Sequence, residues 1–143
     1  MKRLLVAVDG SPCSDRAIRY LIDQRLPEGG ATPPQLLLVN VQRPVSGDVS
    51  TFVAHDQIAD YHREEGLKAL DSARRTLDAA GVAYSFDIAV GAPGEVIARL
   101  AEEKGCDEIV MGTHGRTGLT HLLLGSVSSE VIRRSALPVL LIR

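Results

Sequence analysis

The sequence predicts an α/β fold built on a doubly wound parallel sheet. Five short runs rich in aliphatic and β-branched residues alternate with helix-like stretches along the 143 residues. Four of these runs are almost continuously apolar, as expected for strands that are covered on both faces. Strands that alternate with helices indicate right-handed βαβ units, in which helices cover both faces of the sheet.

The strands are expected in the segments RLLVAV, QLLLVNV, AYSFDIAV, DEIVMG and PVLLIR, at residues 3–8, 35–41, 83–90, 107–112 and 138–143. The third segment alternates in polarity more than the others, because Tyr84, Phe86 and Ile88 fall on one face. This alternation predicts an edge strand.

Four helices are expected between the strands, at residues 14–25, 56–80, 93–105 and 126–135. Each has an apolar stripe at helical spacing. Proline suits the first turn of the third helix, and Gly81 and Gly105 suit helix ends. Two connectors, residues 27–34 and 42–55, interrupt the alternation of strands and helices. Because no repeat or linker interrupts the pattern, we expect a single domain over residues 1–143.

Composition argues against several functional classes. The 16 basic and 18 acidic residues give a net charge of −2, which offers no basic surface for nucleic acid. Cys13 and Cys106 lie far apart and match no zinc or redox spacing, so we expect two reduced thiols. No apolar run is long enough for a membrane span, and the run in MKRLLVAVDGS is too short for a signal peptide. We therefore expect a cytoplasmic protein without a membrane partner.

The segment MGTHGRTGLTHLLLGSVSSEV, residues 111–131, follows the fourth strand and contains four glycines but no lysine. A glycine loop that leads into a helix N-terminus can bind an anion through backbone N–H groups and the helix dipole. Ser126 either donates its hydroxyl to phosphate or only caps the helix, and Ser128 and Ser129 extend the same donor surface. His114 and His121 are expected near phosphate rather than on a metal.

Other phosphate-binding patterns do not match. The Walker pattern is absent, and the three lysines of the chain lie at positions 2, 68 and 104, away from any glycine loop of that form. The GxGxxG fingerprint after the first strand is also absent. A receiver domain would need paired acids after the first strand, but Asp9 stands alone there. Asp9 is either a ligand residue at the carboxyl end of the strand or only a turn former.

At this point the residues resemble a known family. Gly112-Thr113-His114-Gly115, nine further residues and then Gly125-Ser126 reproduce the G-x2-G-x9-G-(S/T) signature of ATP-binding universal stress proteins. The segments VDGSPCSDRAIRYL and SSEVIRRSALPVLLIR resemble the two ends of the same family. The resemblance implies a Rossmann-like three-layer sandwich of the adenine nucleotide alpha hydrolase-like type. Its five-stranded sheet would have the order 3-2-1-4-5, and the family is usually dimeric.

The resemblance also implies which residues bind the adenosine end of ATP. Asp9 would hold the adenosine, Ala7 would line the base pocket, and Val41 would contact adenine. Met111 and Gly112 would border the ribose.

The resemblance likewise implies which residues bind the phosphate end of ATP. Gly115 and Arg116 would lie in the phosphate loop, and Gly125, Ser126 and Val127 would receive the phosphates. Mg²⁺ would accompany ATP mainly through phosphate oxygens, so no metal ligands of the protein are expected.

These features together indicate an ATP-binding regulatory module of the stress response. No convincing general base lies beside the expected phosphates, so any ATPase or self-phosphorylation activity should be weak. A slow ATPase or self-phosphorylating protein and a non-catalytic dimeric scaffold remain the alternatives. The apolar strand 138–143 would leave an exposed sheet edge, which predicts a homodimer paired through that strand.

Overall fold

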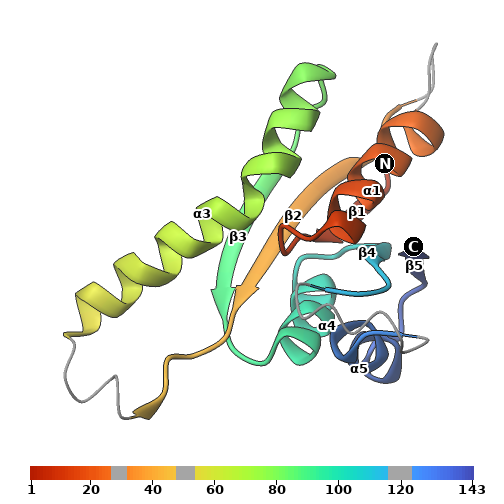
Figure 1. Cartoon of the computed structure of the whole chain (residues 1–143). Helices are drawn as coiled ribbons and strands as arrows, with labels where there is room; N and C mark the ends of the chain where they lie inside the picture. Colours follow the sequence, from red (N-terminus) through yellow and green to blue (C-terminus); the bar gives the residue numbers. More distant parts are fainter. Residues whose placement is uncertain (27–31, 48–53, 116–123) are drawn as a thin grey trace.

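Five parallel strands form one sheet in the order β3-β2-β1-β4-β5 (Figure 1). The structure is a computed structural model that describes residues 1–26, 32–47, 54–115 and 124–143. The strands are β1 (Arg3–Ala7), β2 (Gln35–Gln42), β3 (Ser85–Val90), β4 (Glu108–Gly112) and β5 (Val139–Ile142). This topology confirms the predicted strand order and the edge position of β3.

Helices cover both faces of the sheet and make the expected three layers. Helices α1 and α3 lie on one face, and α4 and α5 lie on the other. Their bounds are α1 (Pro12–Tyr20), α3 (His55–Ala79), α4 (Pro93–Glu103) and α5 (Ser126–Arg134). A π-helical turn, η1 (Leu21–Arg25), continues α1 to the predicted end of that helix.

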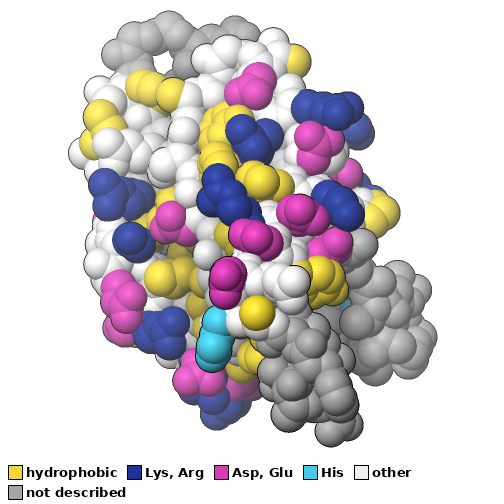
Figure 2. Space-filling view, turned by 90° about the vertical axis from the view of Figure 1, so that its left-hand side faces the viewer, with side chains coloured by type: hydrophobic (Ala, Val, Ile, Leu, Met, Phe, Trp, Pro, Cys, Tyr) yellow, Lys and Arg dark blue, Asp and Glu magenta, His cyan; other side chains and the backbone are white. Residues whose placement is uncertain are grey.

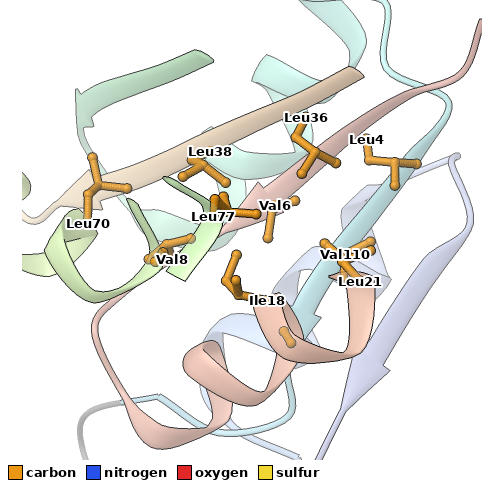
Figure 3. Close-up of a cluster of buried hydrophobic side chains, with 12 residues drawn as sticks. Leu4, Val6, Val8, Ile18, Leu21, Leu36, Leu38, Leu70, Leu77 and Val110 are labelled. Atoms are coloured by element: carbon orange, nitrogen blue, oxygen red, sulfur yellow. The ribbon is translucent and has the colours of Figure 1, made fainter. Parts of the chain in front are cut away.

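Alternate side chains of β1 enter the two layers between sheet and helices. Leu4 and Val6 point into one layer and Leu5 into the other, and all three are fully buried. The first layer also holds side chains of α1, η1 and α3 (Figure 3): Ile18, Leu21, Leu70 and Leu77. The second layer holds side chains of α4 and α5: Ile97, Ala101 and Val131. Because helices cover both faces of the sheet, the sequences of the inner strands are almost continuously apolar.

The predicted start of the first helix was wrong by two residues. Helix α1 begins at Pro12, because the Ser11 hydroxyl accepts a hydrogen bond from Ser14 N–H at 3.2 Å and so caps the helix. Proline is well suited to the first helical position, where its missing N–H costs nothing. Gly81 and Gly105 follow the ends of α3 and α4 with φ of 71° and 65°, as expected for glycines that end helices. The helices themselves end at Ala79 and Glu103, one and two residues before the predicted bounds.

Charges of both signs are mixed over the face that carries α3 (Figure 2). Pairs along the helix contribute to this pattern, with Lys68 beside Glu65 and Arg75 beside Asp71. The described residues form no continuous basic patch on this face (Figure 2). Within the described parts of the chain, no helix has the length and apolarity that a membrane crossing requires.

Gly66 lets α3 approach the edge strand β3. It is buried in the middle of the helix, and a Cβ built there would lie 2.6 Å from Ile88 Cγ2. Such a distance is far inside van der Waals contact, so a larger residue must push the helix or the side chain of Ile88 aside.

We therefore expect Gly66→Ala to lower the free energy of unfolding by about 1–3 kcal/mol, although alanine favours the helix. The matched control is Ser72→Ala on the exposed side of α3, which should raise stability by a few tenths of a kcal/mol, roughly the helix-propensity gain. Urea unfolding followed by circular dichroism measures both. A stabilised Gly66→Ala variant would contradict the close packing.

Candidate functional site

The chain leaves the carboxyl ends of β1 and β4 toward opposite faces of the sheet. Strand β1 continues into α1 on one face, and the chain after β4 leads to α5 on the other. Neighbouring strands that diverge in this way create the crevice in which open α/β sheets bind ligands. A cavity of about 190 Å³ lies at this position.

The cavity brings together nine of the ten residues predicted for the site. They are Ala7, Asp9, Val41, Met111, Gly112, Gly115, Gly125, Ser126 and Val127. The tenth, Arg116, lies outside the described residues. The prediction therefore identified one continuous surface, although the nine residues come from four separate parts of the chain.

Asp9 is fixed by short-range hydrogen bonds at the start of α1. Its Oδ1 accepts from Ser11 N–H at 2.9 Å, and its own N–H donates to Ser14 Oγ at 3.3 Å. The turn-forming role considered from the sequence is therefore real. The turn uses only Oδ1 of the carboxylate. The second oxygen, Oδ2, points toward Gly115 across the cavity. Asp9 can thus form the turn and still contact a ligand.

The three signature glycines are needed for close approach rather than for unusual backbone angles. None of them has a positive φ. A Cβ on Gly112 would lie 2.6 Å from Cys13 Cβ, and one on Gly115 would lie 2.7 Å from Asp9 Oδ2. A Cβ on Gly125 would lie 3.0 Å from the Thr113 carbonyl oxygen. Each glycine therefore brings the segment against a different wall of the site.

The two ends of the signature segment are joined at the carbonyl oxygen of Thr113. This oxygen accepts from Gly125 N–H at 2.7 Å and from the Ser128 hydroxyl at 2.8 Å. Thr113 N–H in turn donates to the Ile142 carbonyl of β5 at 2.8 Å. Ser128 lines the cavity, and its buried hydroxyl donates to the Thr113 carbonyl and so holds the segment closed.

The N-terminus of α5 faces the cavity, and its N-cap residue has no side chain that could cap the helix. Gly125 is the N-cap residue, so the interpretation of Ser126 as the N-cap was wrong. The first turn contains no acidic residue, and within the described residues no side-chain hydrogen bond caps it. Helix α1, in contrast, has the Ser11 cap and Asp15 in its first turn. The exposed donors and the helix dipole make the start of α5 suitable for an anion.

The basic residues of α5 do not reach the cavity. Glu130 accepts hydrogen bonds from both Arg133 and Arg134, and these bonds lower the pKa of the Glu130 carboxyl. Among the described residues, the cationic side chain that does line the cavity is Arg43, just after β2. Cys106 is buried away from the site, and burial raises the pKa of its thiol, which keeps it protonated and unreactive.

Sequence reasoning missed several residues of the cavity wall. Asn40 and Arg43 come from the carboxyl end of β2, and Pro93 and Ile97 come from the start of α4. The sequence does mark Asn40 as unusual, since it is the one amide in the otherwise apolar interior of QLLLVNV. Arg43 is also the first basic residue after that strand. The α4 residues gave none, because proline and isoleucine there are explained by the helix alone.

A wider hollow of about 1020 Å³ lies at the amino ends of the strands. Its charged groups are engaged with one another, since Arg3 Nη1 donates to the Lys104 carbonyl at 2.6 Å and Lys104 Nζ lies 3.8 Å from Asp87 Oδ2. The carboxyl edge remains the better candidate. Over the described ranges, no group of three His, Cys, Asp or Glu side chains is placed to hold a metal ion.

A sequence model of the Universal stress protein family matches residues 1–143. Universal stress protein MJ0531 of Methanocaldococcus jannaschii is 33% identical to this chain over 148 residues, covering 99% of this chain and 82% of that protein.

Solved structures agree with this similarity. Protein MJ0577 of the same organism has a TM-score of 0.80 at 29% identity, covering 99% of this chain and 94% of that chain. A universal stress protein solved in complex with cAMP has a TM-score of 0.71, also at 29% identity, covering 99% of this chain and 97% of that chain.

The role of Ser128 can be tested against its neighbour. Ser128→Ala removes a buried hydroxyl bonded to the Thr113 carbonyl, so we expect the free energy of unfolding to fall by about 1–2 kcal/mol. Ser129→Ala changes an exposed hydroxyl of the same helical turn and should stay within about 0.5 kcal/mol of the parent protein. Chemical denaturation measures both. Equal stability of the two variants would contradict the role of Ser128 in closing the segment.

Proposed function

The chain belongs to the universal stress protein family, and on that premise we propose that it is a regulatory module of the stress response that binds an adenine nucleotide, with ATP as the ligand that the signature favours. The observation that carries the proposal is the cavity at the carboxyl edge, lined by nine of the predicted site residues. A cytoplasmic location and a homodimeric state are part of the same proposal.

The adenosine end is proposed to lie between β2 and the start of α1. Ala7, Val39 and Val41 give this part of the wall an apolar surface suited to a base, and Asp9 Oδ2 is available to accept from ribose hydroxyls. The similarity to a universal stress protein that binds cAMP supports an adenine ligand for this geometry.

The phosphate end is proposed to lie at the start of α5. Backbone N–H groups of Ser126 and Val127, together with the exposed Ser126 hydroxyl, supply donors there. The helix dipole contributes the positive potential that a lysine provides in a Walker site. If Mg²⁺ accompanies ATP, the phosphate oxygens supply most of its ligands.

We propose binding rather than turnover. Among the described residues of the cavity, two side chains have the chemistry of a general base, Asp9 and His114. Asp9 Oδ1 is engaged by Ser11 N–H, and His114 Nδ1 lies 3.0 Å from Thr113 Oγ1. Both groups hold the walls of the site in place. Sustained phosphate release by the purified protein would favour the alternative of a slow ATPase.

Asp9 provides the direct test of the adenosine site. We expect Asp9→Ala to weaken AMP and ATP binding at least about tenfold in isothermal titration calorimetry, equivalent to about 1.4 kcal/mol. The control Asp23→Ala removes an exposed carboxylate of η1, far from the cavity, and should leave affinity unchanged. Equal affinity of the two variants would contradict the assignment, and absence of binding by the parent protein would contradict the proposed function.

The proposed dimer depends on the free edge of β5. The carbonyls of Pro138 and Ile142 accept from Ile109 of β4 and from Thr113 just after it, so the backbone groups of Val139 and Leu141 point outward, away from β4. Val139→Pro removes one outward N–H while sparing the pairing with β4. We expect this variant to sediment as a monomer at concentrations where the parent protein is a dimer. A Val139→Pro variant that still dimerises would place the interface elsewhere.

A further inference from the structure

The backbone ladder between β1 and β2 stops one bond early at the cavity. Its last bond runs from Val8 N–H to the Val39 carbonyl at 2.9 Å. In a regular parallel ladder with this register, Val41 N–H would next donate to the Val8 carbonyl. That bond is not made. The Val8 carbonyl instead accepts from Asn40 Nδ2 at 2.8 Å.

The consequence is an unpaired backbone N–H in the wall of the site. Gly91 N–H donates to the Gln42 carbonyl, so the groups of Gln42 face β3. Since backbone groups alternate in direction along a strand, those of Val41 face β1. There the chain has already turned away at Asp9 and Gly10. Val41 N–H makes no hydrogen bond within the described parts of the chain, and Val41 lines the cavity.

Asn40 is held in the orientation that this arrangement needs. Its side chain is 3% exposed, and Gln42 Nε2 donates to its Oδ1 at 2.6 Å. The amide oxygen therefore accepts from Gln42 while the amide nitrogen donates to Val8. A buried amide is stable only when its donors and acceptors are paired. Both partners belong to the protein, so Asn40 acts on the position of the backbone.

We propose that Asn40 is a positioning residue that determines base specificity. By bonding to the Val8 carbonyl, it holds that oxygen out of the ladder position, so that Val41 N–H and the adjacent Val41 carbonyl stay available to the edge of a base. Adenine presents an acceptor at N1 beside a donor at N6, which complements this pair. Guanine presents the reverse at N1 and O6 and leaves the backbone groups unsatisfied, which is costly in a buried site. This inference rests on the proposed binding of an adenine nucleotide.

The backbone effect can be measured without any ligand. In the parent protein, Val41 N–H should exchange with solvent at least about tenfold faster than the paired Val39 N–H, followed by NMR. Asn40→Ala frees the Val8 carbonyl, so the ladder should extend and Val41 exchange should slow at least about tenfold. Gln24→Ala is the control, because it removes an exposed amide of η1 that contacts neither Asn40 nor the cavity and should not change Val41 exchange. Fast Val41 exchange in Asn40→Ala would overturn the proposal.

The specificity effect is measured by calorimetry with AMP and GMP. The parent protein and Gln24→Ala should prefer AMP by at least about tenfold, and Asn40→Ala should lose most of that preference through weaker AMP binding. If the parent protein binds AMP and Asn40→Ala keeps its full preference, the role of Asn40 is wrong while the nucleotide site stands. If the parent protein binds neither nucleotide, the proposed function itself fails and the specificity claim fails with it.

Discussion

The carbonyl oxygen of Thr113 determines the shape of the candidate site. It accepts from Gly125 N–H and from the Ser128 hydroxyl, and so brings the N-terminus of α5 against the end of β4. Without this junction the helix dipole would not point into the crevice between β1 and β4. Because Thr113 N–H also bonds to Ile142, the same junction is tied to the outer strand of the sheet. A partner chain bound at β5 and a ligand bound at α5 would therefore both affect the hydrogen bonds of Thr113.

The junction also explains how this fold could bind an anion without a lysine. Helix α5 begins with a glycine cap and no acidic residue in its first turn, which leaves its N–H groups and its positive end for a ligand. A Cβ at position 112, 115 or 125 would lie 2.6, 2.7 or 3.0 Å from its nearest neighbour, so each glycine lets two parts of the site approach closely. Buried polar side chains sit beneath both halves of the site. Ser11, Ser14 and Asn40 support the end of β1, and Ser128 supports the junction.

The sequence predicted the architecture well for physical reasons. Continuous apolar runs identify strands that are covered on both faces, and the alternation around Phe86 identified the edge strand. The position of Asp9 and of the glycine segment after strands placed both at one edge of the sheet. The strand order and the roles of individual residues came from the resemblance to universal stress proteins, and those roles stay predictions.

The details that sequence reasoning missed depend on which way a short polar side chain turns. Ser11 and Ser14 are equally good caps by residue type, and only the turn after β1 decides that Ser11 caps α1. Ser128 could face a ligand or the segment behind it, and helical spacing does not distinguish the two. Asn40 was visible as a polar residue in an apolar strand, but its effect on Val41 requires the register between β1 and β2.

The most direct test of the account is an NMR titration of the ¹⁵N-labelled protein with AMP and with ATP. We expect the amides of Val41, Gly115, Ser126 and Val127 to shift together with a single dissociation constant for each nucleotide, because all four line one cavity. Shifts confined to the hollow at the amino ends of the strands, or no shifts at millimolar nucleotide, would contradict the assignment of the nucleotide site to the carboxyl edge of the sheet.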